Sequence, residues 1–155
     1  MDNLQQVKKQ LLRVYAFLNS LTILVIVILY LLENKLKYPY TIDNQKFWQV
    51  VLAVISVVAG AVVPIWLRLL SFSRFIKAKR NGTYKDLYNF EKTVIIFSWI
   101  AFSLSPLAYV LKINLWVRYL VVFLGFYALY YSFPSDKKLK LDKKLFNLRS
   151  DGNFK

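Results

Sequence analysis

The chain has 155 residues, enough for one domain, and 57% of them are hydrophobic although the net charge is +14. This composition is too apolar for a disordered chain or an ordinary soluble domain, and it favours an integral membrane protein. Because cysteine and histidine are both absent, disulfides, thiol catalysis, metal sites built on cysteine or histidine, and nucleophile–histidine pairs are excluded.

Four apolar runs, each long enough to cross a membrane, follow one another along the chain. The first, at about 11–32, has Arg13 as its only charge, and no small-residue cleavage site follows it, so we interpret it as a retained signal anchor. The others lie at about 47–70, 93–111 and 113–133. Because backbone polar groups inside lipid must be satisfied within their own segment, the sequence predicts an all-α integral membrane protein with four transmembrane helices.

Positive charge is concentrated in segments that share one side of the predicted membrane. Lysine and arginine occur before the first span, between the second and third spans, and in the tail at 134–155, whereas the third connection is a short hairpin around Lys112. The first connection also carries three lysines, which reduce the contrast, but Glu33 and Asp43 accompany them. By the positive-inside rule, both termini and the second connection face the cytoplasm. The sequence thus predicts a multi-pass protein of the plasma (inner) membrane, with a transmembrane domain over 1–133 and a basic cytoplasmic tail.

The second connection, around 72–92, carries signals for two helical arms instead of an irregular loop. An Asn-Gly pair at 81–82 interrupts a helix, and Thr83 stands three positions before Asp86, which is the spacing of an N-terminal capping box. We therefore expect the second helix to continue to about Arg80 and the third to begin at about Tyr84, so that the two form a cytoplasmic helical hairpin extension beyond their spans.

Small side chains form a stripe along each of the two middle spans. Their spacing puts each set on one helix face, where small residues allow helices to approach closely. Two interpretations stay open: a seam between consecutive helices of one chain, and the interface of a homo-oligomer or the lining of a pore. The residues are Ala53, Ser56 and Gly60 in the second span, and Ser98, Ala101, Ser105 and Ala108 in the third.

Two prolines, Pro64 and Pro106, each lie inside a span. Proline removes a backbone donor and kinks a helix, so both residues are candidate hinges. The alternative is a static kink that serves packing, because membrane spans tolerate proline well.

Basic side chains near the ends of the spans are candidate contacts for lipid phosphates. Arg118 lies about one and a half turns into the fourth span, where it reaches the outer headgroups or turns inward to hold a lipid phosphate or a partner's carboxylate. In the tail, Leu141, Leu145 and Leu148 are spaced to lie together on a short helix against the headgroups of an anionic inner leaflet. The other candidate phosphate contacts are Arg68, Arg74, Lys77, Lys79 and Arg80.

All eight acidic residues lie outside the predicted spans. Ion-coupled transport and most intramembrane acid–base chemistry use a carboxylate or histidine at membrane depth, so we identify no catalytic, cofactor-binding or metal-binding residue. Three functions stay open: a non-enzymatic accessory, regulatory or immunity-type partner of another membrane protein; a self-assembling, pore-forming protein such as a holin-like or defence-linked effector; and a protein that handles anionic lipid. Nucleic acid is not expected as a partner, because no recognition module accompanies the basic charge.

Overall fold

The computed structural model describes residues 3–33, 44–71, 73–74, 82–146 and 148, and no strand occurs in these ranges. The elements in chain order are α1 (Asn3–Glu33), α2 (Gln45–Val57), η1 (Val58–Val62), α3 (Val63–Ser71), α4 (Tyr84–Val110), α5 (Leu115–Ser132) and α6 (Asp136–Leu145). Four stretches are long and apolar enough to span a membrane: Asn3–Leu32, Gln45–Ser71, Tyr84–Val110 and Leu115–Ser132. The predicted all-helical fold with four candidate spans is confirmed, and the first helix begins eight residues before its predicted start.

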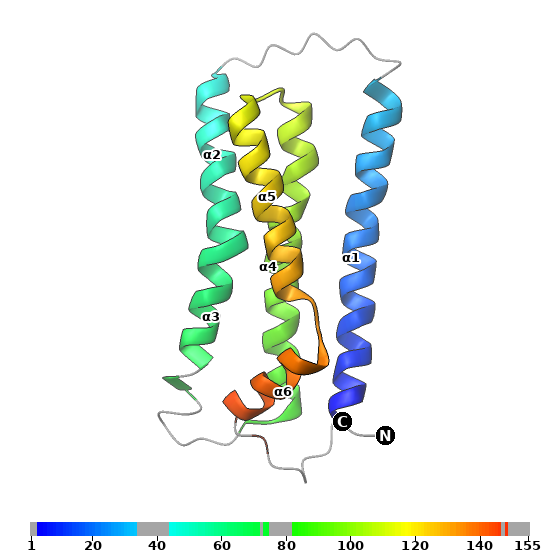
Figure 1. Ribbon diagram of the computed structural model, residues 1–155, viewed down its shortest axis with the longest axis vertical. Coiled ribbons are helices and arrows are strands. Elements are labelled where there is room, and N and C mark those ends of the chain that lie inside the picture. The colour runs from blue at the N-terminus through cyan, green and yellow to red at the C-terminus, as the bar shows by residue number, and fades with distance from the viewer. Residues whose placement is uncertain (1–2, 34–43, 72, 75–81, 147, 149–155) are drawn as a thin grey trace.

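The four long stretches run side by side, with α2, η1 and α3 forming one continuous stretch (Figure 1). α4 packs against α1, against α5 and against the α2–η1–α3 stretch, so it is the central helix of the bundle. α6 lies across the end at which α1 and α4 begin, which we call the α6 end (Figure 1). At the opposite end, the turn end, a short turn containing Lys112 joins α4 to α5.

α4 begins at Tyr84 because a complete capping box precedes it, as the sequence predicts. The Thr83 hydroxyl accepts a hydrogen bond of 3.2 Å from the Asp86 N–H, and the Asp86 carboxylate accepts one of 2.9 Å from the Thr83 N–H. These bonds satisfy backbone donors that a helix start leaves without partners. The other predicted arm of the hairpin falls largely on 75–81, which lie outside the described residues.

A π-helical segment, η1, stands directly before Pro64. In a regular α-helix the Pro64 ring would clash with the carbonyl of Gly60, four residues earlier. In η1 the helix is wider, and the Val63 N–H bonds to the carbonyl of Val58, five residues back. Pro106 is buried within α4. The sequence-predicted irregularity at Pro64 thus takes the form of a π-bulge, and the hinge role of both prolines stays a prediction.

Candidate functional site

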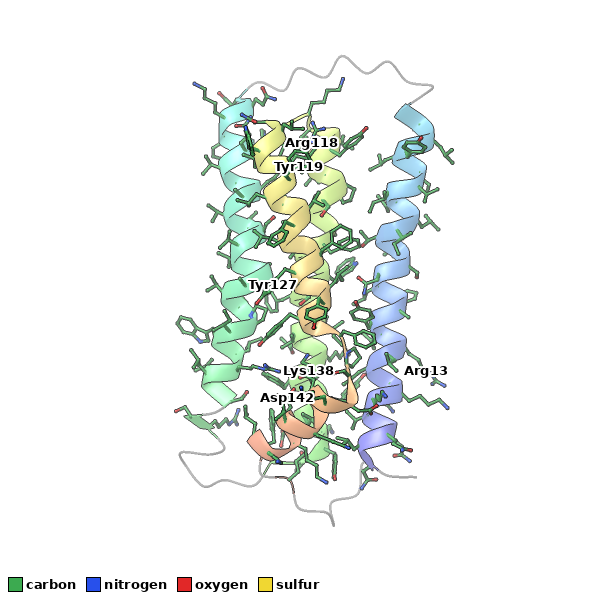
Figure 2. The ribbon with its side chains drawn as sticks, in the orientation of Figure 1. Arg13, Arg118, Tyr119, Tyr127, Lys138 and Asp142 are labelled. Carbon is green, nitrogen blue, oxygen red and sulfur yellow. The ribbon has the colours of Figure 1, made fainter. Side chains whose placement is uncertain are left out.

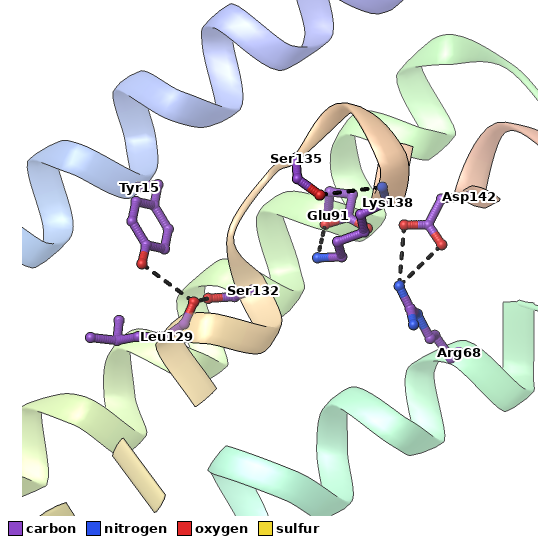
Figure 3. Close-up of polar contacts among 8 residues, drawn as sticks. All are labelled: Tyr15, Arg68, Glu91, Leu129, Ser132, Ser135, Lys138 and Asp142. Atoms are coloured by element: carbon purple, nitrogen blue, oxygen red, sulfur yellow. Dashed lines mark hydrogen bonds and ion pairs between the residues drawn. The ribbon is translucent and has the colours of Figure 1, made fainter. Parts of the chain in front are cut away.

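Two ion pairs join α6 to the bundle at the α6 end (Figure 3). The Lys138 ammonium lies 2.7 Å from a Glu91 carboxylate oxygen on α4, and the Arg68 guanidinium on α3 lies 3.2 Å from the Asp142 carboxylate. The exposed fractions of the Glu91 and Asp142 side chains are 0% and 3%. Pairing with a cation lowers the cost of burying a charged carboxylate, so these four side chains, the charge network, favour the observed position of α6.

One face of α6 explains its position in the fold. The helix begins after Ser135, whose hydroxyl accepts a 3.3 Å hydrogen bond from the Lys138 N–H. Leu139, Asp142 and Phe146 follow at intervals of three and four residues, so they share one face, and all three are buried. Leu139 packs in a cluster with Val7, Leu11, Tyr84 and Ile95 from α1 and α4.

Two carboxylates of the charge network were missed by the sequence analysis because acids were judged only by their distance from the apolar runs. A usable signal is present: Glu91 stands four residues after the buried Leu87 and four before the buried Ile95, on the packed face of α4. The expectation that Leu141, Leu145 and Leu148 lie together at the headgroups is wrong. Leu141 is exposed, whereas Leu145 and Leu148 pack against the buried pair of Leu87 and Phe146.

Aromatic and polar contacts extend the charge network to α1 and α5. The ring centroid of Tyr131 on α5 lies 5.0 Å from the Arg68 guanidinium and 5.7 Å from the Lys138 ammonium, distances that allow cation–π attraction. The Tyr15 hydroxyl on α1 donates to the carbonyl of Leu129 over 3.3 Å (Figure 3). Side chains from five helical segments therefore converge at the α6 end.

The small residues of the middle spans pack within the chain. A Cβ added to Gly60 would lie 3.3 Å from the Ala101 Cβ and 3.7 Å from the Ala128 Cβ, so η1, α4 and α5 approach closely at this level. Ser105 lies beside α5, with its Oγ 3.0 Å from where a Cβ on Gly125 would stand. Of the seven predicted small residues, Ser56, Gly60, Ser98, Ala101, Ser105 and Ala108 are buried and Ala53 is half-buried.

The turn end carries a mostly apolar cavity of about 300 Å³ between α1, α4 and α5. Of the α5 residues that line it, Arg118 is the nearest to the start of the helix, and we call that end of the cavity its mouth (Figure 2). The Arg118 Nη2 donates to the carbonyl of Ile113 over 3.3 Å, and the guanidinium lies 5.1 Å from the ring centroid of Tyr109. The lining residues are Ile26, Leu29, Tyr30, Phe102, Ser105, Pro106, Tyr109, Arg118, Val122 and Phe126.

The two halves of α1 differ in how they pack. Toward the α6 end, Val7 and Leu11 are completely buried, and further along the Thr22 hydroxyl accepts a 2.9 Å hydrogen bond from the Trp99 Nε1–H on α4. Beyond that point, at residues 23–32, every described side chain is exposed except the half-buried Leu29. α1 is therefore joined to the bundle through the part of the helix up to Thr22.

The other basic residues that the sequence suggested as phosphate contacts lie in different structural environments. Arg68 belongs to the charge network, Arg74 is exposed just after α3, and Lys77, Lys79 and Arg80 lie outside the described residues. A shallow hollow of about 600 Å³ lies at the α6 end beside Gln5, Lys8, Lys9, Leu12, Arg13, Ala16 and Asp136.

Within the described part of the chain, no group of three or more histidine, cysteine, aspartate or glutamate side chains is arranged to hold a metal ion. Comparison of the chain with known proteins finds no matching family, no matching curated protein and no matching solved structure.

Proposed function

We propose that the protein is a non-enzymatic membrane protein that acts through helix–helix contacts, as an accessory, regulatory or immunity-type partner of another membrane protein. The observation that supports this most directly is the turn-end half of α1. Between positions 21 and 32, every described side chain is exposed except Thr22 and Leu29. This half-helix gains almost no packing from its own chain, so its surface is available to a second helix.

The side of α1 that faces away from the cavity has a spacing suited to such contact. Its exposed side chains recur at alternating intervals of four and three residues, the pattern on which two helices interlock at a shallow left-handed angle. In a membrane, helices associate through close van der Waals packing, since lipid is as apolar as their side chains. The residues are Phe17, Leu21, Leu24, Ile28 and Leu31, which we call the outer α1 face.

The placement of the small residues favours this proposal over a self-assembling pore. Gly60 and Ala101 face each other within one chain, and Ser98 and Ser105 are also buried. A pore built by several copies would then need an interface other than the small-residue stripes. The outer α1 face offers bulky side chains instead, which suit a lateral contact better than the lining of a conduit.

We also propose that the α6 end faces the cytoplasm of a plasma (inner) membrane, beside an anionic leaflet. The support is the positive charge exposed there, because each lysine or arginine near an anionic surface contributes attraction of about 1 kcal/mol. The exposed cations of this end include Lys9, Arg13, Lys137, Lys140 and Lys144.

Photo-crosslinking from within the membrane tests the proposed partner contact. A benzophenone amino acid at Ile28, on the outer α1 face, should give one dominant adduct in native cells, and a second probe replaces the exposed Leu120 on α5 as the control. We expect an adduct with a second, polytopic protein from Ile28, at least fivefold stronger than from Leu120. Leu24→Trp should abolish it, because a bulkier side chain disrupts interlocking packing.

Three outcomes would contradict the proposal. Equal and diffuse crosslinking from Ile28 and Leu120 would mean that lipid alone surrounds α1. An adduct of the chain with itself would favour the self-assembling alternative. If the adduct still forms in Leu24→Trp, the partner does not bind through the outer α1 face.

A further inference from the structure

The cavity at the turn end points to a second ligand, distinct from a partner helix. We propose that it binds one anionic phospholipid, with an acyl chain lying between α1, α4 and α5 and the lipid phosphate on the Arg118 guanidinium. This site uses the inward side of α1, through Ile26 and Tyr30, and not the outer α1 face.

The shape of the cavity suits a single chain. Arg118, Val122 and Phe126 line it at intervals of four residues on one face of α5, so it extends about 12 Å along the helix at 1.5 Å per residue. The Phe126 ring lies 5.7 Å from the Phe102 ring, which brings α4 and α5 together at the deep end. A helix is about 10–12 Å across, so a cavity of about 300 Å³ is too small to hold one, whereas a narrow hydrocarbon chain fits it.

Most of the side chains that line the cavity are apolar, so bound water is unfavourable over most of its length. Ile26, Leu29, Phe102, Val122 and Phe126 contribute hydrocarbon surface. An apolar cavity of this size stays dry or takes an apolar ligand, because water there would lack hydrogen-bond partners.

Arg118 supplies the complementary charge at the mouth. Its Nε is buried and has no hydrogen-bond partner in the described structure, and no ion pair joins Arg118 to a carboxylate among the described residues. The one contact of Nη2 with the Ile113 carbonyl leaves donors of the guanidinium fork for an anion, and phosphate matches that fork.

The depth of Arg118 agrees with a headgroup. It stands three residues after the start of α5 at Leu115, about 5 Å into the helix, and the strongly exposed Trp116 stands two residues earlier in the same helical turn. Tryptophan is enriched at the membrane–water interface, where phosphates lie. A net negative lipid is favoured over a zwitterionic one, because no described carboxylate side chain pairs with Arg118.

Native mass spectrometry of the full chain, released from detergent with an equimolar mixture of phosphatidylglycerol and phosphatidylcholine of identical chains, tests the phosphate contact. We expect one retained phosphatidylglycerol, held about tenfold more tightly than phosphatidylcholine. Arg118→Gln should remove that preference, because both lipids carry the phosphate and the arginine charge favours the lipid whose net charge is negative. Arg118→Lys, which keeps the charge, should retain part of it, and the exposed Arg13→Gln at the α6 end is the matched control.

A second pair of variants tests the acyl-chain contact. Ile26→Trp fills the cavity and should lower binding of both lipids at least fivefold, whereas Ile28→Trp, on the other side of α1, should leave it unchanged. Glycerol phosphate, a headgroup without chains, should not displace the bound lipid, but lysophosphatidylglycerol should. Far-ultraviolet circular dichroism checks that each variant keeps its helix content.

The proposal is overturned if Arg118→Gln keeps the full preference, or if Arg13→Gln loses as much of it, because the charge effect would then be general. Displacement by glycerol phosphate would reduce the site to a simple anion site. Equal effects of Ile26→Trp and Ile28→Trp would place the lipid outside the cavity. Because the partner contact is tested at Ile28 and the lipid at Ile26, each proposal can fail without the other.

Discussion

Arg68 and Arg118 lie at opposite ends of the bundle and have similar aromatic neighbours but different hydrogen-bond acceptors. The guanidinium of Arg68 is 5.0 Å from the ring centroid of Tyr131, and that of Arg118 is 5.1 Å from the ring centroid of Tyr109. Arg68 has a carboxylate, Asp142, at 3.2 Å, whereas Arg118 has a backbone carbonyl at 3.3 Å. Among the described side chains, Arg68 is therefore paired with a carboxylate of its own chain, and Arg118 is not.

This difference coincides with a difference in packing. At the α6 end, α1 is packed against α4 and α6, and side chains from distant parts of the chain are joined by ion pairs. At the turn end, α1 is separated from α4 and α5 by the cavity, and most of its side chains are exposed. Both proposed binding sites, the outer α1 face and the cavity, lie toward the incompletely packed end.

The largest expected effect comes from breaking the closed end at Glu91. Glu91→Ala leaves the Lys138 ammonium, whose side chain is 12% exposed, without its carboxylate. Removing one partner of a buried ion pair typically costs about 3–5 kcal/mol, so the free energy of unfolding should fall by roughly 3 kcal/mol. Thermal unfolding in detergent measures the loss, and trypsin should cleave α6 much faster than in the parent protein.

The double variant Glu91→Leu with Lys138→Met separates charge from packing. Replacing both charges by apolar side chains of similar size is often neutral or stabilising, so this variant should recover most of the lost stability. If it is as unstable as Glu91→Ala, the pair does not hold α6 and the closed end depends on apolar packing alone.

A smaller effect, on the lipid preference, is expected when a substitution adds a carboxylate near Arg118 at the turn end. Val122→Glu places an acid one helical turn after Arg118 on the cavity wall, where it can pair with the guanidinium. The preference for phosphatidylglycerol over phosphatidylcholine should then fall about tenfold, because the charge at Arg118 is already compensated. Native mass spectrometry with the two lipids measures this preference.

Val122→Gln is the control for Val122→Glu, because glutamine has nearly the same size as glutamate and is polar but carries no charge. It should keep most of the lipid preference. An equal loss in both variants would assign the effect to the shape of the cavity and would remove the contrast between the two arginines.

The elements of this fold were predictable to the extent that they depend on local sequence. The four apolar runs and the capping box at Thr83 follow from partition into lipid and from spacing within a few residues, and the structure contains all of them. The charge network depends on which face of α4 meets which face of α6, across 47 residues between Glu91 and Lys138. A tail rich in lysine looks solvated on its own, and only tertiary packing shows that Asp142 is buried.

The same limit applies to the turn end. The sequence placed Arg118 near a headgroup region, but it did not indicate that α1 would separate from α4 and α5 beside it. The cavity is lined by side chains of three helices, including Phe102 and Phe126, whose ring centroids lie 5.7 Å apart. Such geometry is set by packing between helices and has no signature within one of them.

The smallest effect is expected at the exposed ion pair of the α6 end, between Lys8 and Asp136. Their charged atoms are 2.6 Å apart, closer than either pair of the charge network, yet their side chains are 30% and 67% exposed. Exposed pairs contribute about 0–1 kcal/mol despite good geometry, because water already solvates both charges. Lys8→Gln should therefore lower the free energy of unfolding by no more than about 0.5 kcal/mol.

Asp136→Asn should cost slightly more than Lys8→Gln, because Asp136 also stands in the first turn of α6, where a negative charge interacts favourably with the helix dipole by about 0.3–1 kcal/mol. Raising the salt concentration to about 1 M shortens the screening length to about 3 Å and should remove most of both effects. The loss in Glu91→Ala should persist at that salt concentration, because water and ions do not reach a buried carboxylate. If all three variants respond to salt alike, Glu91 is accessible in solution and the α6 end is not closed.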